Sequence, residues 1–86
     1  MTAEDIRGLV LGAVAAVLAV DRTAVAATTT LAELPTFNSF RMVEIVERLE
    51  GQLDVEVDGT DLVPDNLNRV DALCALFART ASHVRG

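Results

Sequence analysis

The sequence lacks several residue types on which chemistry and stability often depend. Among its 86 residues there are one cysteine, one histidine, two prolines, and no lysine, tryptophan or tyrosine. A single cysteine excludes an internal disulfide and fits a reducing compartment, so we expect a cytoplasmic protein. One histidine and one cysteine cannot build a structural zinc site. The scarcity of glycine and proline argues against a disordered or collagen-like chain.

Long hydrophobic runs are also missing. The longest, residues 9–20, is interrupted by Gly12, and a helix that spans a bilayer needs about 20 apolar residues. No positively charged region precedes this run, so we expect neither a signal peptide nor a membrane span. About half of the residues are hydrophobic, mostly Ala, Val and Leu. A chain of this length is expected to form one domain, residues 1–86, with an economical core.

The charge is negative and unevenly placed. The formal net charge is −6, and residues 39–66 alone hold eight acidic side chains against two arginines. Such a segment repels the phosphates of nucleic acid and attracts basic patches on protein surfaces. We therefore expect protein partners and no nucleic acid.

Three segments show the spacing of apolar residues that is typical of amphipathic helices. The expected helices cover residues 3–19 behind Thr2, a stretch beginning at or just after Asn38, and residues 69–81 behind Asn68. Threonine and asparagine suit these starts because their side-chain oxygens accept a first-turn N–H. The pattern predicts an all-α domain. No long apolar stripe is left over once the helices pack, which predicts a monomer.

The segments between these helices follow other patterns. Residues 21–38 lose the helical periodicity, and we expect a long loop held on the core by Leu31 and Leu34. Residues 53–58 alternate apolar and acidic side chains, a strand signal. No other segment alternates, so an extended segment that packs its valines inward is expected instead. A short helical turn is expected over residues 61–63, closed by the proline that follows.

Residues for conventional catalysis or metal binding are scarce. His83 stands three residues from the end of the chain, and we expect a solvent-exposed side chain. Cys74 lies on the apolar face of the last helix and is expected to be a buried structural thiol. Residues 54–65 superficially match a calcium-binding loop, but Asp65 stands where that loop requires a glutamate. We expect a solvated acidic face, no metal site, no catalytic residue and no enzyme activity.

Ser39 remains as the candidate for chemistry. It is expected at the start of the second helix, directly after the cap Asn38. A hydroxyl in that position is exposed and stands beside the positive end of the helix dipole, where a phosphodiester is favoured. Taken alone, a serine at a helix start is usually only a first-turn residue. The residues around Ser39 must therefore show whether it is a modification site.

Those surroundings resemble the acyl and peptidyl carrier proteins, the phosphopantetheine-binding family. In that family an Asp-Ser-Leu or similar tripeptide opens the second helix, and here Asn38-Ser39-Phe40 occupies the place. The stretches that follow also fit the family pattern, namely Val43-Glu44-Ile45-Val46, Leu49-Glu50, Leu53–Val57 and Asp61–Pro64. The resemblance covers essentially the whole chain. It implies a four-helix bundle with three long helices, one short helix and a long loop between helices 1 and 2.

The resemblance also implies a function. A free-standing carrier would bear 4′-phosphopantetheine, transferred from coenzyme A, on Ser39, and would shuttle acyl or aminoacyl thioesters in polyketide or nonribosomal-peptide biosynthesis. Its partners would be a phosphopantetheinyl transferase, an acyl- or aminoacyl-loading ligase, and downstream synthase or tailoring enzymes. The family's docking face maps onto Phe40, Val43, Glu44, Glu47 and Glu50.

Two departures from the family pattern keep an alternative open. Asn38 stands where the family usually has aspartate, and Thr36 or Phe37 makes the approach to it bulkier where the family tends to have glycine. Asparagine caps a helix about as well as aspartate, but it lacks the charge that Mg²⁺ prefers in a ligand. The alternative is an unmodified module of the same fold that docks to a partner without carrying cargo.

Overall fold

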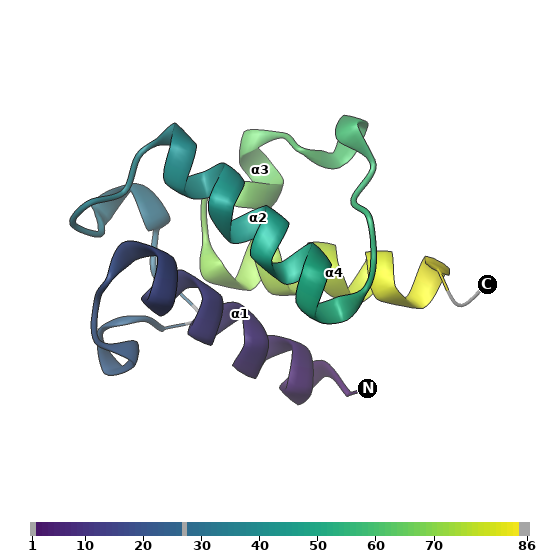
Figure 1. Ribbon diagram of the computed structural model, residues 1–86, viewed down its shortest axis with the longest axis horizontal. Helices are drawn as coiled ribbons and strands as arrows, with labels where there is room; N and C mark the ends of the chain where they lie inside the picture. The colour runs from purple at the N-terminus through teal and green to yellow at the C-terminus, as the bar shows by residue number, and fades with distance from the viewer. Residues whose placement is uncertain (1, 27, 85–86) are drawn as a thin grey trace.

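The part of the chain that the structure describes forms three long α-helices and one short one, as the sequence predicts (Figure 1). The computed structural model describes residues 2–26 and 28–84, with the side chains of the last helix described as far as Ala81. The helices are α1 (Ala3–Leu18), α2 (Ser39–Leu53), α3 (Pro64–Leu67) and α4 (Val70–Val84). The all-α carrier-type bundle with a long loop between its first two long helices is therefore confirmed.

Helix α1 begins at a capping box. The Thr2 hydroxyl accepts the backbone N–H of Asp5 at 3.2 Å, and the Asp5 carboxylate accepts the backbone N–H of Thr2 at 3.0 Å. These two bonds satisfy N–H groups that the first helical turn leaves unpaired. The helix ends at Leu18, where Ala19 adopts a left-handed conformation with φ 56°. The predicted range of residues 3–19 is confirmed to within one residue.

Two glycines on α1 make room for an arginine. The guanidinium of Arg22 lies so close to the helix that a Cβ atom on Gly12 would be 3.2 Å from its Nη1, and one on Gly8 would be 3.6 Å from its Nη2. A helix-interior glycine costs about 1 kcal/mol relative to alanine. A Cβ on Gly12 would require the Arg22 side chain to shift by a few tenths of an ångström.

The loop between α1 and α2 is tied to the core. Leu31 is fully buried and Leu34 is half-buried, as expected, and Val25 is buried as well. The backbone N–H of Leu31 donates to the carbonyl of Asn68 at 2.9 Å, and the N–H of Val70 donates to the carbonyl of Thr29 at 3.1 Å. The loop contains two short 3-10 turns, at residues 22–24 and 31–33. Buried side chains and backbone hydrogen bonds therefore attach the loop to the helical core.

The segment after α2 is extended, and its valines turn inward. Val57 is buried and Val55 is half-buried against the core. The expected helical turn over residues 61–63 is wrong in position, because the turn lies at Gly59–Asp61. Pro64 opens α3 instead of closing that turn. Proline suits the first position of a helix, where its missing N–H would have no partner.

The last helix begins one residue later than predicted. Asn68 is the C-cap of α3 and has αR backbone angles (φ −82°, ψ −15°), whereas an N-cap residue is extended. The expected N-cap role of Asn68 is therefore wrong. Its backbone carbonyl already accepts the N–H of Leu31, which fixes it at the end of α3.

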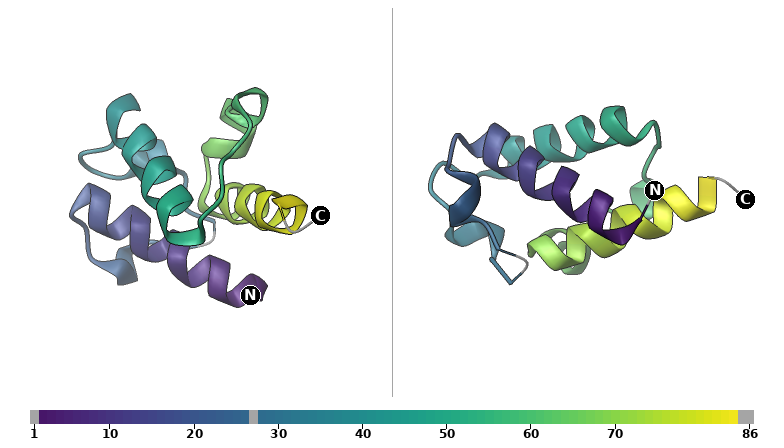
Figure 2. Two further views of the ribbon diagram at one scale, coloured as in Figure 1. Left: turned by 45° about the vertical axis from the view of Figure 1, so that its right-hand side comes forward. Right: turned by 90° about the horizontal axis from the view of Figure 1, so that it is seen from below.

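The core lies where α1 meets α2 and α4 (Figure 2). Its buried side chains come from all three long helices and from the two connecting loops, and the largest fully buried ones are Phe77, Leu18, Leu31, Ile45, Leu49, Leu73 and Leu76. In the part of the chain that the structure describes, no helix combines the length and apolar character needed to cross a bilayer.

Candidate functional site

Ser39 is the first residue of α2 and is exposed. Asn38 before it is extended (φ −158°, ψ 177°), and its side-chain Oδ1 accepts the backbone N–H of Arg41 at 2.9 Å. The backbone carbonyl of Asn38 accepts the N–H of Met42 at 3.0 Å and so closes the first helical turn. The predicted start of this helix and the predicted cap are both confirmed. The cap fixes the backbone on which the Ser39 hydroxyl is carried.

The electrostatics at this helix start favour an anion. The N-terminus of a helix carries a partial positive charge, which stabilises a nearby anion by about 0.3–1 kcal/mol at an exposed site. The first turn of α2 contains no acidic residue. The cap itself, Asn38, is a neutral amide. A phosphodiester on Ser39 would therefore meet no neighbouring carboxylate from this turn.

The outer face of α2 combines apolar and charged side chains. Phe40 is 81% exposed and Val43 is 56% exposed. Glu44 and Glu47 are also exposed. Arg41 forms an ion pair with Glu44, with Nη1 and Oε1 3.3 Å apart. This pair reduces the negative charge that the face presents.

Glu50 differs from the other acidic residues of α2. It is half-buried, and its Oε2 accepts the backbone N–H of Val57 at 2.8 Å. The bond ties the last turn of α2 to the extended segment that follows it. Four of the five expected docking side chains are thus exposed together on α2. The fifth, Glu50, is hydrogen-bonded to the backbone of the extended segment after α2.

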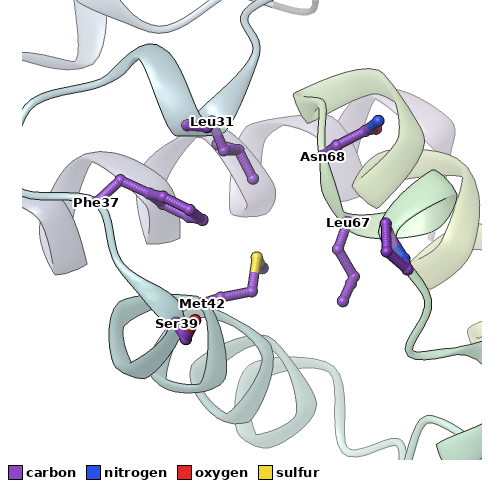
Figure 3. Close-up of a pocket in the computed structure, with 8 residues that line it drawn as sticks. Leu31, Phe37, Ser39, Met42, Leu67 and Asn68 are labelled. Atoms are coloured by element: carbon purple, nitrogen blue, oxygen red, sulfur yellow. The ribbon is translucent and has the colours of Figure 1, made fainter.

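An apolar pocket of about 260 Å³ adjoins Ser39 (Figure 3). Its wall is formed by the long loop, the start of α2 and helix α3, through Leu31, Ala32, Phe37, Ser39, Met42, Pro64, Leu67 and Asn68. The side chains of Leu31, Phe37, Met42 and Leu67 converge on it in the close-up. The sequence does not predict this pocket, because its walls come from three segments that only the folded chain brings together.

The other residues that the sequence offered for chemistry, Cys74 and the acidic side chains, do not form a catalytic or metal site in the part of the chain that the structure describes. Cys74 is half-buried rather than buried as expected, and burial raises the pKa of its thiol, although the nearby Arg7 opposes the shift. A thiol with a raised pKa is a poor nucleophile near neutral pH. Among the described residues, no group of three or more His, Cys, Asp and Glu is arranged to hold a metal ion. The side chain of His83 lies outside the described residues.

A family model described as the phosphopantetheine attachment site matches residues 8–77. The chain belongs to this family of carrier proteins. The match covers α1 from Gly8 onward, the long loop, α2, α3 and about half of α4. Comparison with curated proteins gave no significant match. The family is non-catalytic, so the predicted absence of enzyme activity agrees with it, and its prosthetic group is 4′-phosphopantetheine.

The residues of this carrier domain fit that group. An exposed serine hydroxyl is available for a phosphodiester, the helix start beside it favours an anion, and the adjacent pocket is apolar. When attached, the group supplies a thiol on a long flexible arm, and this thiol holds a substrate as a thioester. The protein itself offers an exposed serine hydroxyl at a capped helix start and an exposed face of α2 beside it.

Proposed function

We propose that Ser39 is the residue that carries 4′-phosphopantetheine, and that the protein delivers acyl or aminoacyl thioesters between enzymes of polyketide or nonribosomal-peptide biosynthesis. The observation that carries the proposal is the position of Ser39, exposed at the start of α2 directly after the cap Asn38. The family's phosphopantetheine description supports the prosthetic group. A phosphopantetheinyl transferase would supply it from coenzyme A, and a loading ligase and downstream synthase or tailoring enzymes would then use it.

The exposed face of α2 supports transient contact with these enzymes. Phe40 and Val43 offer apolar area beside the attachment point, and Glu44 and Glu47 offer negative charge. Contacts between exposed charges are weak and sensitive to salt, which suits a carrier that must leave each partner. Glu50 contributes indirectly, since its carboxylate holds the neighbouring segment through Val57.

The pocket beside Ser39 supports an apolar cargo. Its lining side chains are mainly aliphatic or aromatic, and its volume of about 260 Å³ lies just below the range of about 300–1,000 Å³ that is usual for ligand pockets. A flexible arm attached at Ser39 can fold back on the domain, so that an apolar group at its end enters the pocket. Burial of apolar area there is favourable by about 25 cal/mol per Å².

Mass spectrometry tests the attachment. The purified protein is incubated with coenzyme A and a broad-specificity phosphopantetheinyl transferase, and its intact mass is compared with that of the variant Ser39→Ala. We expect the wild-type chain to gain one phosphopantetheine group and the variant to gain none. Ser82, which is the other serine of the chain, provides the matched control Ser82→Ala, which should still be modified.

Two outcomes would contradict the proposal. A mass gain that survives Ser39→Ala would place the group elsewhere. No gain in the wild-type chain, together with partner binding that is insensitive to Ser39→Ala, would favour the unmodified docking module. The neutral cap Asn38, which differs from the family's usual aspartate, is the observation that favours this second function.

A further inference from the structure

Met42 is the adaptable side chain of the pocket beside Ser39. It extends from the start of α2 toward Leu31, Phe37 and Leu67, and its sulfur lies near the centre of the close-up (Figure 3). Only 9% of Met42 is exposed. Methionine is unbranched and has three rotatable side-chain bonds, so it fills irregular space and adjusts to its neighbours. The position of this side chain therefore decides how much of the pocket is open.

The walls that face Met42 are held by the backbone of the long loop. Leu31 is fully buried, and its N–H donates to the carbonyl of Asn68 at 2.9 Å. The N–H of Phe37 donates to the carbonyl of Leu34 at 3.4 Å. Moving either wall would break a backbone hydrogen bond, whereas moving the end of Met42 breaks none. A change in the size of the pocket consequently falls on Met42.

The pocket wall offers nothing to a charged group. None of its eight residues is charged, and six of them are apolar. Of the two polar ones, Ser39 is the proposed attachment point, and the side chain of Asn68 points away from Met42 in the close-up. An ammonium group that is buried without a carboxylate or another acceptor loses its hydration uncompensated, which is strongly unfavourable. An aminoacyl thioester carries such a group beside its carbonyl, and a simple acyl thioester does not.

The volume of the pocket limits the size of the cargo. A water molecule in the liquid takes up about 30 Å³, so the pocket volume of about 260 Å³ equals that of about nine waters. A methylene group is similar in size to a water molecule, and packing leaves part of such a space unfilled. The pocket therefore suits an acyl group of about four to eight carbon atoms.

We propose that Met42 sets the upper size of the cargo, and that this cargo is an uncharged, apolar acyl group of about four to eight carbon atoms. The inference rests on the proposed function, because it requires attachment at Ser39. It decides between the acyl and aminoacyl thioesters that the proposed function leaves open. Each methylene that enters the pocket favours the buried position of the cargo, until Met42 leaves no space for another.

A matched pair of cargoes tests the class of substrate. The protein is loaded by the transferase from hydrolysis-stable amide analogues of 4-methylpentanoyl-coenzyme A and leucyl-coenzyme A, which share one carbon skeleton and differ by the amino group. The measurements are made at about pH 6, below the ordinary pKa of about 7.7–8.0 of an α-amino group, so that the leucyl cargo is charged. Butanoyl, hexanoyl, octanoyl and dodecanoyl analogues then measure the size limit.

Two readouts report whether the cargo is buried. Urea unfolding compares each loaded chain with the same chain carrying the bare arm, and NMR follows the methyl signal of Met42. We expect the 4-methylpentanoyl cargo to lower the equilibrium constant of unfolding by about five- to twentyfold and to shift the Met42 signal. The leucyl cargo should change that constant by about twofold or less. Stabilisation should increase from butanoyl to hexanoyl or octanoyl and should not increase further with dodecanoyl.

Variants of α2 test the role of Met42. Met42→Ala removes the three outer heavy atoms of the side chain, and we expect the best cargo to become longer by about two or three carbon atoms. Met42→Leu nearly conserves the volume and should keep the wild-type preference. Val46→Ala is the matched control, because Val46 is a buried residue of the same helix outside the pocket wall. It should lower stability with every cargo equally and leave the preferred length unchanged.

Equal stabilisation by the leucyl and 4-methylpentanoyl cargoes would overturn the assignment of an uncharged acyl group. An unchanged preferred length in Met42→Ala, or the same change in Val46→Ala, would overturn the role of Met42. Intact mass separates these results from the proposed function. A chain that is never loaded contradicts both, whereas a chain that is loaded at Ser39 but responds to no cargo contradicts this inference alone.

Discussion

The hydroxyl of Thr36 lies 2.7 Å from the backbone carbonyl oxygen of Leu18, to which it can donate a hydrogen bond. This contact joins the approach to α2 with the last residue of α1. Thr36 has a φ of 68°, in the left-handed region that a β-branched residue rarely adopts. Glycine adopts such a positive φ without steric cost. The hydrogen bond compensates for the strain at a position two residues before the cap of Ser39's helix.

Removing that hydroxyl should destabilise the fold. We expect Thr36→Val, which keeps the shape and the branched Cβ, to lower the free energy of unfolding by about 1 kcal/mol, because the Leu18 carbonyl loses a donor. Thr36→Ser keeps the hydroxyl and is expected to match the wild type. Thr36→Gly loses the bond but relieves a strain of about 1–2 kcal/mol, so it should be at least as stable as Thr36→Val. Urea unfolding measures all three, and a Thr36→Val chain as stable as the wild type would show that the contact contributes nothing.

Asn38 controls both the cap and the charge beside Ser39. We expect Asn38→Asp to speed modification by a phosphopantetheinyl transferase with little change in stability, since aspartate caps as well as asparagine and binds Mg²⁺ better. Asn38→Ala removes the acceptor of the Arg41 N–H and should cost about 1 kcal/mol of stability. Initial rates with a fluorescent coenzyme A analogue and urea unfolding separate the two effects. An unchanged rate for Asn38→Asp would show that the neutral cap is no handicap.

Glu50 should act on the loop rather than on partners. We expect Glu50→Ala to lower the stability by about 1 kcal/mol and to speed hydrogen exchange of the Val57 amide, which loses its acceptor. Glu47→Ala is the matched control, because Glu47 is an exposed glutamate of the same helix. Exchange is followed residue by residue by NMR. Equal protection of the Val57 amide in both variants would remove the structural role assigned to Glu50.

Two surface aspartates should make stability depend on acidity. The backbone N–H and the hydroxyl of Thr60 hold the pKa of the Asp58 carboxyl below its usual range, and Thr23 does the same for Asp21. The folded chain therefore binds these protons more weakly than the unfolded chain. The resulting stability is complete above the unfolded pKa of about 3.9 and is lost as the pH falls through the lower folded values.

Asn substitutions isolate this effect. Asp21→Asn with Asp58→Asn keeps an oxygen acceptor at each turn and removes both titrating groups. We expect the wild type to lose more stability than this variant when urea unfolding is repeated from about pH 5 to about pH 3. Parallel losses in the two chains would show that other carboxyls cause the acid sensitivity.

The sequence predicts the helices and Ser39's position well, because periodicity and capping are local. Thr2, Asn38 and the apolar spacing define the first two long helices almost to the residue. Local rules mislead at Asn68, which resembles an N-cap but closes α3, since its backbone N–H donates to the carbonyl of Pro64 at 2.9 Å. The pocket depends on which distant segments meet, and spacing along the chain carries no such information.

The two backbone hydrogen bonds between the long loop and the α3–α4 junction have a consequence for the newly made chain. They join Leu31 to Asn68 and Thr29 to Val70. The long loop can therefore take its final position only after residues 68–70 have been synthesised. The serine leaves the ribosome early, whereas the surface around it is complete only after α4 has emerged and docked. A transferase that reads this surface would therefore modify finished domains and pass over incomplete ones, so that loading also serves as a check on folding.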